Sequence, residues 1–284
     1  MMSMRKQLLG SVFIALLFFV GCKQPVTFGG EPRTTVYRSV ISLSPSTTEL
    51  MALTGIPIRG RTKACDFPIQ VRDVEVVADL KPNYELIASK KPDLILYDRD
   101  LYGSTEVEKL KQTGAKILPL GAYTVEGHIK EMYELGNLLS GEATINDYVI
   151  RLRKNIQASL GDRPTRPITA IMVIPDSGGR HMLAGSKSFQ ADMVRISGAT
   201  LLGPDSNKFE SLNPEWVLSQ NPDWIIVAGT SKEFLADTRF SGLSAVKNSK
   251  YFGIDQDVCL RRGMRVEKFI YGAHKMIMLG EGKK

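Results

Sequence analysis

One segment of the sequence recurs in the second half of the chain, and this repeat constrains the fold more than any other feature. Residues 83–96, NYELIASKKPDLIL, align with residues 213–226, NPEWVLSQNPDWII; Asn, Glu, Pro and Asp match, and apolar residues correspond. In each copy the asparagine can cap a helix, the helix dipole favours the glutamate, and the proline ends the helix before a buried strand. We therefore expect two lobes that contain the same supersecondary unit.

Apolar, β-rich runs alternate with helix-like stretches on both sides of a helical middle section. The expected strands lie at 36–43, 93–97, 115–120, 168–174 and 223–228. The expected helices lie at 105–113, 188–197 and 265–279. Such alternation is typical of an α/β fold with mainly parallel sheets. In addition, residues 46–49, Ser-Thr-Thr-Glu, match a capping box in front of a helix.

The middle of the chain, from residue 125 to about 160, has a helical pattern that is interrupted at Ser140-Gly141. Its second piece carries apolar residues at helical spacing, and prolines follow it. It can join two lobes as a stiff strut. We expect an N-terminal lobe at 36–124, linking helices at 125–163 and a C-terminal lobe at 164–284.

The N-terminus has the pattern of a signal sequence. Two cationic residues precede an apolar run at 8–20, which is short for a bilayer of about 30 Å. The run ends in Phe19-Val20-Gly21-Cys22, which resembles a bacterial lipobox with Phe19 in place of the usual leucine. This predicts a cleaved signal at 1–21, a lipidated Cys22 and a tether at 22–35; an ordinary signal with a chance cysteine is the alternative.

Composition narrows the class of protein. The chain has 284 residues, a formal charge of +7, 43% hydrophobic and 24% charged residues, as in ordinary globular proteins. The sequence contains no basic run interleaved with aromatics, which would have suggested nucleic-acid binding. It also lacks a nucleophile elbow, a phosphate-binding loop and a dinucleotide fingerprint, the motifs that would have suggested an enzyme. The histidines, His128, His181 and His274, lack zinc-ligand spacing. Cys65 and Cys259 are expected to be separate buried thiols, although an oxidising compartment would allow them to pair.

Several stretches together resemble the cobalamin- and siderophore-type periplasmic binding proteins of ABC importers. They are residues 38–50 (RSVISLSPSTTEL), 65–68 (CDFP), both copies of the repeat, and 262–265 (RGMR). The resemblance covers about residues 36–280. It implies two Rossmann-like lobes with mainly parallel sheets joined by one long backbone helix, with a ligand cleft between the lobes and small lobe motions.

The resemblance also implies how the protein works. It implies a monomeric, extracytoplasmic, membrane-anchored receptor without enzymatic activity or resident cofactor. The receptor would capture a corrinoid or an iron chelate for the permease and ATPase subunits of an importer. By motif position, Glu85 and Glu215 would dock onto the membrane subunits. Both glutamates can also simply stabilise the helix N-termini on which they lie.

Ligands of open parallel sheets bind beyond the carboxyl ends of the strands. This rule selects six loops, at 44–47, 65–68, 97–102, 175–181, 207–209 and 257–262. The candidate ligand-binding residues on them are Phe67, Tyr97, Asp98, Tyr102, Phe209, Asp257 and Arg261.

The identity of the ligand stays open at this point. By resemblance, Asp257, Arg261 and Phe209 match corrinoid-contacting positions, whereas Ala64 and Asp79 stand where cobalamin binders carry aromatics. The 97–102 loop suits a ferric siderophore equally, through Tyr97, Asp98, Arg99 and Tyr102. Haem, with a Tyr or His ligand, is a third option, and His181 is the histidine expected near the cleft. Asp257 and Arg261 can also form a local ion pair, and an α/β enzyme or a sensor without a transporter is the alternative class.

Overall fold

The computed structural model describes residues 37–282, which belong to one compact unit. The expected signal sequence, Cys22 and most of the tether lie outside these residues. Within the described part of the chain, no helix is both long and apolar enough to cross a bilayer.

A five-stranded, entirely parallel sheet with helices α1 to α3 forms the N-terminal lobe. Its strands run in the order β3-β2-β1-β4-β5, so the order reverses between β1 and β4. The strands are β1 (Val40–Ser42), β2 (Ile58–Thr62), β3 (Val76–Ala78), β4 (Leu94–Asp98) and β5 (Lys116–Leu120). The helices are α1 (Pro45–Thr54), the 3-10 turn η1 (Ile69–Asp73), α2 (Tyr84–Ser89) and α3 (Ser104–Lys111).

A second, mixed sheet builds the C-terminal lobe. Its strand order is β11-β10-β6-β7-β9, and β8 pairs with β6 beside this path. The pairs of β6 with β8 and β10, and of β10 with β11, are parallel, whereas β7 is antiparallel to both of its neighbours. The strands are β6 (Thr169–Ile174), β7 (Met182–Ala184), β8 (Thr200–Leu201), β9 (Phe209–Ser211), β10 (Trp224–Ala228) and β11 (Tyr251–Ile254). The helical elements are α6 (Phe189–Ser197), α7 (Pro214–Gln220), α8 (Lys232–Leu235), η2 (Thr238–Phe240), α9 (Ser244–Lys247), α10 (Gln256–Leu260) and α11 (Val266–Gly280).

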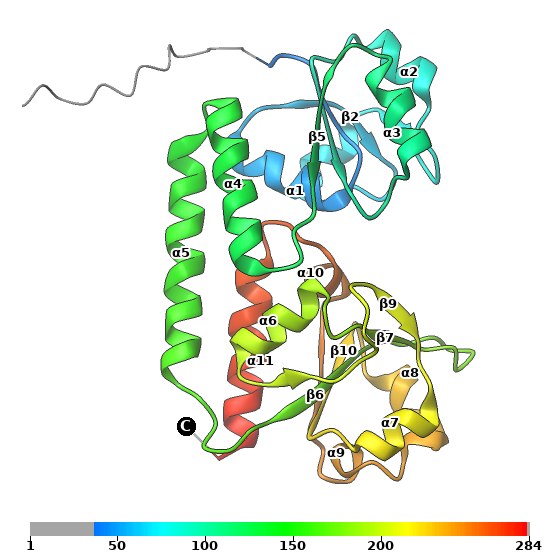
Figure 1. Ribbon diagram of the computed structural model, residues 1–284, viewed down its shortest axis with the longest axis vertical. Helices are drawn as coiled ribbons and strands as arrows, with labels where there is room; N and C mark the ends of the chain where they lie inside the picture. Colours follow the sequence, from blue (N-terminus) through cyan, green and yellow to red (C-terminus); the bar gives the residue numbers. More distant parts are fainter. Residues whose placement is uncertain (1–36, 283–284) are drawn as a thin grey trace, which may run out of the picture. The chain divides into compact units, whose positions relative to one another are not determined.

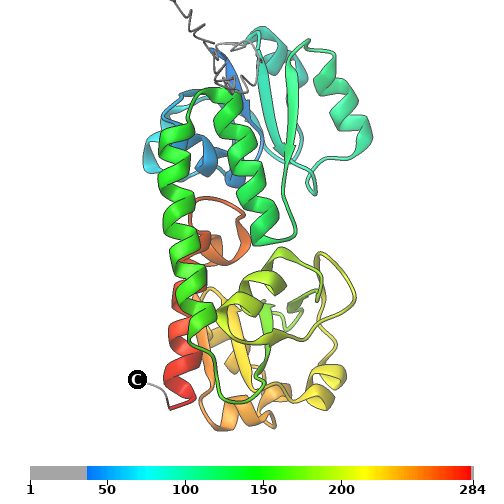
Figure 2. The same ribbon diagram turned by 60° about the vertical axis from the view of Figure 1, so that its left-hand side comes forward.

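Two helices connect the lobes. α4 (Val125–Leu139) ends at Ser140, whose φ of 54° is left-handed, and α5 (Glu142–Gly161) begins directly afterwards, so the expected break is confirmed. α5 has 20 residues and is therefore about 30 Å long. Figure 1 and Figure 2 show it running alongside both lobes, and α11 packs against it.

The repeat is a structural unit in both lobes. Asn83 and Asn213 accept hydrogen bonds from the backbone N–H groups of Leu86 and Trp216, each at 3.0 Å, so both expected helix caps are confirmed. β4 and β10, which follow, are buried at every position. Figure 1 shows α2 and α7, the helices of the repeat, on different lobes.

The aspartate of each repeat fastens the adjacent central strand. Asp93 accepts hydrogen bonds from the backbone of residues 38 and 39, just before β1, at 2.9 and 2.8 Å. Asp223 accepts the backbone N–H and the hydroxyl of Thr169, the first residue of β6, at 2.8 and 2.9 Å. A carboxylate at the same place therefore aligns a parallel strand pair in each lobe.

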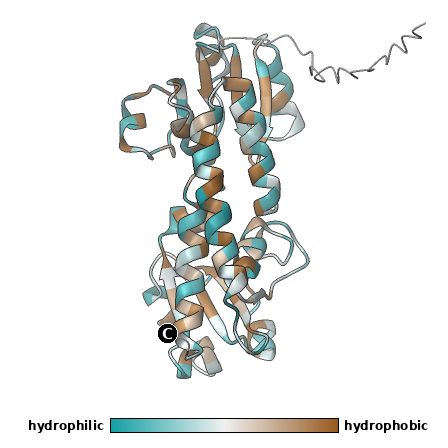
Figure 3. Cartoon of the chain, turned by 90° about the vertical axis from the view of Figure 1, so that its left-hand side faces the viewer, coloured by the Kyte–Doolittle hydropathy of each residue, from teal (hydrophilic) through white to brown (hydrophobic). Residues whose placement is uncertain are grey.

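One apolar core runs through the linking helices. Its buried residues come from β1 and β4, from α4 and α5, and from β6, β10 and α11. Figure 3 shows apolar residues along the strands and alternating polar and apolar residues along the long helices. Because the core is continuous, the lobes are packed onto a shared frame.

The expected capping box at residues 46–49 is wrong. The helix begins two residues earlier than expected, at Pro45, and Ser44 is the cap, accepting from the Thr47 N–H at 3.1 Å. Glu49 is fully buried instead of folding back onto the helix N-terminus. Its carboxylate faces arginines of the C-terminal lobe.

Candidate functional site

The two lobes meet through an arginine-rich loop between α10 and α11. Arg261, Arg262 and Arg265 extend from this loop to carboxylates of the N-terminal lobe. We call this set the inter-lobe junction; it consists of Glu49, Asp66, Asp98, Asp100, Asp257, Arg261, Arg262 and Arg265. The junction includes residues of three of the six loops that the sequence selects, at 65–68, 97–102 and 257–262. A fourth loop, at 44–47, contacts it, because Ser46 accepts a hydrogen bond from the Arg262 backbone N–H.

Arg261 lies between carboxylates of both lobes. Its guanidinium is 2.7 Å from Asp66 Oδ1, 2.8 Å from Asp257 Oδ1 and 3.4 Å from Glu49 Oε1. The hydrogen bond from Arg261 lowers the pKa of Asp66, which keeps it ionised. The Asp66 and Asp257 side chains are 38% and 39% exposed, whereas Arg261 is 12% exposed. Groups from solvent can therefore reach these two carboxylates, and the expected pair of Asp257 with Arg261 is also a local ion pair.

Arg265 binds the buried end of the junction. Its Nη2 is 2.7 Å from Glu49 Oε1 and its Nε is 3.2 Å from Oε2, a fork on one carboxylate. The guanidinium also lies 4.5 Å from the centre of the Phe67 ring. Burial opposes the charge of Arg265, but the Glu49 carboxylate outweighs it and the pKa of Arg265 is raised.

Arg262 enters the N-terminal lobe. Its Nη2 is 2.5 Å from Asp98 Oδ1 and 2.8 Å from Asp100 Oδ2, and its Nη1 donates to the Gly121 carbonyl at 3.0 Å. Tyr123 donates its hydroxyl to Asp100 Oδ1 at 2.5 Å. Burial lowers the pKa of Arg262, but the two aspartates raise it further, so the net pKa is raised.

The aromatic candidates occupy different environments. Phe67 is half-buried at the junction. Tyr97 packs with the apolar cluster on the α2 and α3 side of the sheet and is 8% exposed. Tyr102 packs edge-on against Tyr97 and donates its hydroxyl to the Leu43 carbonyl; burial raises its pKa to about 12. Phe209 opens β9, half-buried.

His181 has both ring nitrogens occupied. Its Nδ1 accepts from the Asp176 backbone N–H at 3.0 Å, so the proton is on Nε2, which lies 3.1 Å from Asp237 Oδ2. The ring packs against Phe234 and Phe240 and is 3% exposed. It is thus a packed core histidine. Among residues 37–282, no cluster of three or more His, Cys, Asp or Glu side chains is arranged to hold a metal.

Both cysteines in the described residues are free and buried, as expected. Cys65 lies 3.0 Å from the Thr48 hydroxyl and 3.1 Å from that of Thr62. Burial raises the pKa of the Cys259 thiol well above its usual range, so it stays protonated.

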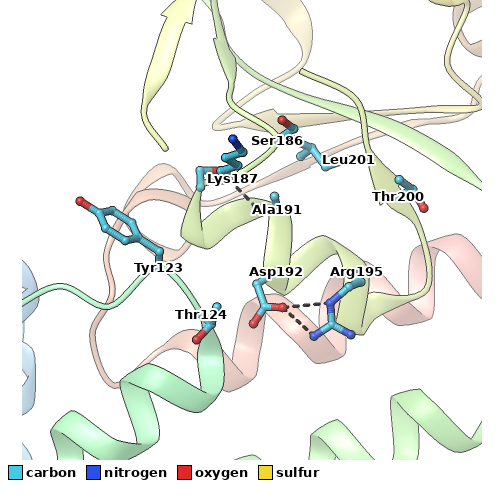
Figure 4. A pocket seen from close by; sticks show the side chains of 10 residues that line it. Tyr123, Thr124, Ser186, Lys187, Ala191, Asp192, Arg195, Thr200 and Leu201 are labelled. Carbon is cyan, nitrogen blue, oxygen red and sulfur yellow. Dashed lines mark hydrogen bonds and ion pairs between the residues drawn. The ribbon is translucent and has the colours of Figure 1, made fainter. Parts of the chain in front are cut away.

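A cavity of about 280 Å³ lies next to the junction, between the β5–α4 loop and α6. Figure 4 shows Tyr123 and Thr124 on one side and Ser186, Lys187 and Ala191 on the other. These residues come from both lobes. The rule about carboxyl ends of strands did not select residues 186–191, because they form the loop after the antiparallel strand β7 and the first turn of α6.

Sequence reasoning also missed the roles of Glu49, Asp100 and Arg262. The available signal was charge in an unusual place: Glu49 stands in the otherwise uncharged helix PSTTELMALT, and residues 261–265 hold three arginines. Which carboxylate each arginine meets depends on the packing of the lobes, and the sequence carries no direct sign of it.

Two α/β lobes bridged by a long helix, with charged loops of both lobes meeting between them, define the helical-backbone class of solute-binding proteins. The chain belongs to the periplasmic binding protein family, whose sequence pattern matches residues 40–258.

Known proteins of this kind resemble the chain over most of its length. An uncharacterised ABC transporter substrate-binding lipoprotein, YvrC of Bacillus subtilis (strain 168), is 26% identical over 255 residues, covering 86% of this chain and 79% of YvrC. The vitamin B12-binding protein of Salmonella typhimurium (strain LT2) is 26% identical over 235 residues, covering 77% and 80%. The crystal structure of the vitamin B12-binding protein BtuF of Vibrio cholerae superposes with a TM-score of 0.76 at 20% identity, covering 87% and 99%.

Proposed function

We propose that this protein is an extracytoplasmic receptor that binds a corrinoid or an iron chelate and delivers it to an ABC importer. The family supports the class of function. The observation that carries the ligand assignment is Arg261, which is held between two half-exposed carboxylates of different lobes. The Phe67 ring, which follows Asp66 in the sequence, lies at the same junction against Arg265.

This arrangement suits a large ligand with polar edges and a flat apolar face. Asp66 and Asp257 can accept hydrogen bonds from amide or hydroxyl groups of the ligand. When they do so, the Arg261 guanidinium becomes available to a ligand carboxylate or phosphate, which it can bind with two parallel hydrogen bonds. Phe67 and Phe209 offer apolar area for a macrocycle. Corrinoids and ferric chelates combine these features.

Titration calorimetry with cobalamin, haem and a panel of ferric siderophores tests the proposal. One of these ligands should bind, and Asp257→Ala combined with Arg261→Ala should weaken its binding by at least about tenfold, or 1.4 kcal/mol. Arg153→Ala is the matched control, since Arg153 pairs with Glu126 on the surface of the linking helices. The proposal fails if none of the ligands binds, and the anchor role fails if the double variant binds the best ligand as tightly as the control.

The receptor is proposed to be held at a membrane by a lipid on Cys22. The sequence before this cysteine supports the assignment, and two or more acyl chains would give stable anchoring. Fractionation of bacteria that express the protein tests it. Wild type should sediment with membranes and incorporate labelled fatty acid, whereas Cys22→Ser should do neither. Equal fatty-acid labelling of both forms would contradict the anchor.

A further inference from the structure

The N-terminal lobe has a ligand crevice of the usual kind for its topology, and the protein fills this crevice with its own side chain. In open α/β sheets the crevice lies where the strand order reverses, beyond the carboxyl ends of the strands. Here the reversal is between β1 and β4. Arg262 reaches both: its backbone N–H donates to Ser46, after β1, at 3.1 Å, and its guanidinium binds Asp98, the last residue of β4.

The surroundings of Arg262 are closely fitted. Its side chain is 12% exposed and that of Asp98 is 7% exposed. Gly121 has a φ of +115°, and a Cβ atom there would lie 2.9 Å from Asp98 Oδ1 and 3.1 Å from Arg262 Nη2. A glycine is therefore needed at 121 both for its backbone and for the space that the guanidinium takes.

Arg262 and Arg261 differ in whether a ligand can reach the groups that they bind. The partners of Arg262 are Asp98, Asp100 and a backbone carbonyl, all inside one lobe and mostly buried. The neighbouring Arg261 binds half-exposed carboxylates that a ligand can approach. Consecutive residues of one loop thus combine a fixed contact with an adaptable one.

We propose that Arg262 is a positioning residue that pins the α10–α11 loop of the C-terminal lobe into the N-terminal lobe. The pin fixes the opening between the lobes before any ligand arrives and holds Arg261 at the junction. Both terminal nitrogens of the planar guanidinium are held, Nη2 by two carboxylates and Nη1 by a carbonyl. Such contacts fix direction as well as distance, which suits a pin. The effect on lobe geometry is independent of the ligand; its effect on affinity rests on the proposed function.

The pin can be tested by electron–electron distance measurements on the full chain without ligand. Spin labels at Ser89→Cys and Ser219→Cys, exposed equivalents on α2 and α7, report the separation of the lobes. Cys22→Ser prevents labelling at that cysteine. The chain without introduced cysteines, treated in the same way, measures any labelling of the buried Cys65 and Cys259. Wild type and the Arg153→Met control should give one narrow distance distribution.

Arg262→Met should broaden this distribution. Arg262→Lys should give a width between those of wild type and Arg262→Met, because lysine keeps the charge but lacks the planar fork. If Arg262→Met does not fold, Arg262→Met with Asp98→Asn removes the buried charges together, and Gly121→Ala displaces the guanidinium while leaving the arginine in place. Distributions as narrow as wild type in the folded variants would overturn the pin.

Ligand affinity separates the two parts of the inference. If the variants populate the binding-competent geometry about a tenth of the time, their apparent Kd rises about tenfold. A broad distribution with unchanged affinity would leave the pin standing and overturn its role in ligand binding. Absence of binding in wild type would contradict the proposed function while the distance result still decides the pin.

Discussion

His128 is a buried ring of α4 that joins the linking helices to the C-terminal lobe through one hydrogen-bonded chain. Its Nε2 lies 3.2 Å from the Tyr148 hydroxyl of α5, and that hydroxyl donates to the Gly263 carbonyl of the arginine loop at 3.3 Å. Because the Tyr148 hydroxyl uses its proton on Gly263, its oxygen accepts a hydrogen bond from the Nε2–H of the neutral His128 ring. Burial, with a further contribution from the Arg262 charge, lowers the pKa of His128 to about 4.

This pKa predicts a loss of stability in mild acid. His128 has a pKa near 6.5 in the unfolded chain and about 4 in the folded one, so between these values the unfolded state binds more protons. The free energy of unfolding should therefore decrease as pH falls from about 6.5 to 4, by up to about 3 kcal/mol. Urea denaturation at several pH values measures this.

His128→Gln keeps a donor for Tyr148 but does not titrate. Its unfolding free energy should fall less steeply over the same pH range, while the carboxylates contribute equally to both proteins. Parallel curves for the variant and wild type would show that His128 does not set the acid sensitivity.

Glu49 shows what single residues hide from sequence reasoning. In SPSTTEL its position after Ser and Thr satisfies a local capping rule, yet Pro45 is favoured at the first helical position and starts the helix earlier. Its two arginine partners lie more than two hundred positions away. The local rule was correct in predicting a helix; the role of the carboxylate depended on contacts between lobes.

At the scale of elements, the helix–proline–strand unit keeps its backbone conformation in both lobes. Lys91 and Asn221 stand immediately before the prolines and have φ values of 45° and 41°. Asparagine tolerates this left-handed conformation better than lysine does. Asn221 also binds Ser244 with its side chain, at 2.9 Å to both the hydroxyl and the backbone N–H.

Glycine should therefore have opposite effects at these two places. Lys91→Gly relieves left-handed strain at some entropic cost, so the unfolding free energy should rise by roughly 0.5–1 kcal/mol. Asn221→Gly removes two hydrogen bonds and should lower it by about 1 kcal/mol or more. Thermal and urea unfolding of both variants measure the difference. A destabilised Lys91→Gly protein would contradict the strain argument.

Elements were the scale at which the sequence was most informative. The break at Ser140-Gly141, the strand at 115–120 and the helix near 188–197 all follow from apolar periodicity and turn residues, which act locally, and the structure confirms them. The antiparallel pairing of β7 was not foreseen, because a strand of three residues, Met182–Ala184, has too short a pattern to show its direction.

At the scale of the whole molecule, one acidic side chain is exposed at the same place in each lobe. Glu85 and Glu215 lie in the first turns of α2 and α7 and are both exposed. We propose that they dock onto basic residues of a permease dimer. Glu85→Ala combined with Glu215→Ala should abolish uptake, since exposed charges steer and orient partners, while ligand affinity and folding stay unchanged.

Uptake of the ligand identified by calorimetry into whole cells measures this. Glu108→Ala with Glu233→Ala is the matched control, as it removes one exposed glutamate from each lobe on α3 and α8. Either single variant should be less impaired than the pair. Normal uptake by the Glu85 and Glu215 double variant would contradict the docking role.

The two lobes present the same exposed helix start, on α2 and α7, but different residues at the junction between them. A partner assembled from two identical subunits would meet the same exposed acid on α2 and on α7. In the proposed complex, a solute held between the halves would meet Asp66 and Phe67 from one and Asp257 and Arg261 from the other. Two lobes that share one unit can thus combine a pseudosymmetric exterior for assembly with an asymmetric interior that would accept its cargo in one orientation.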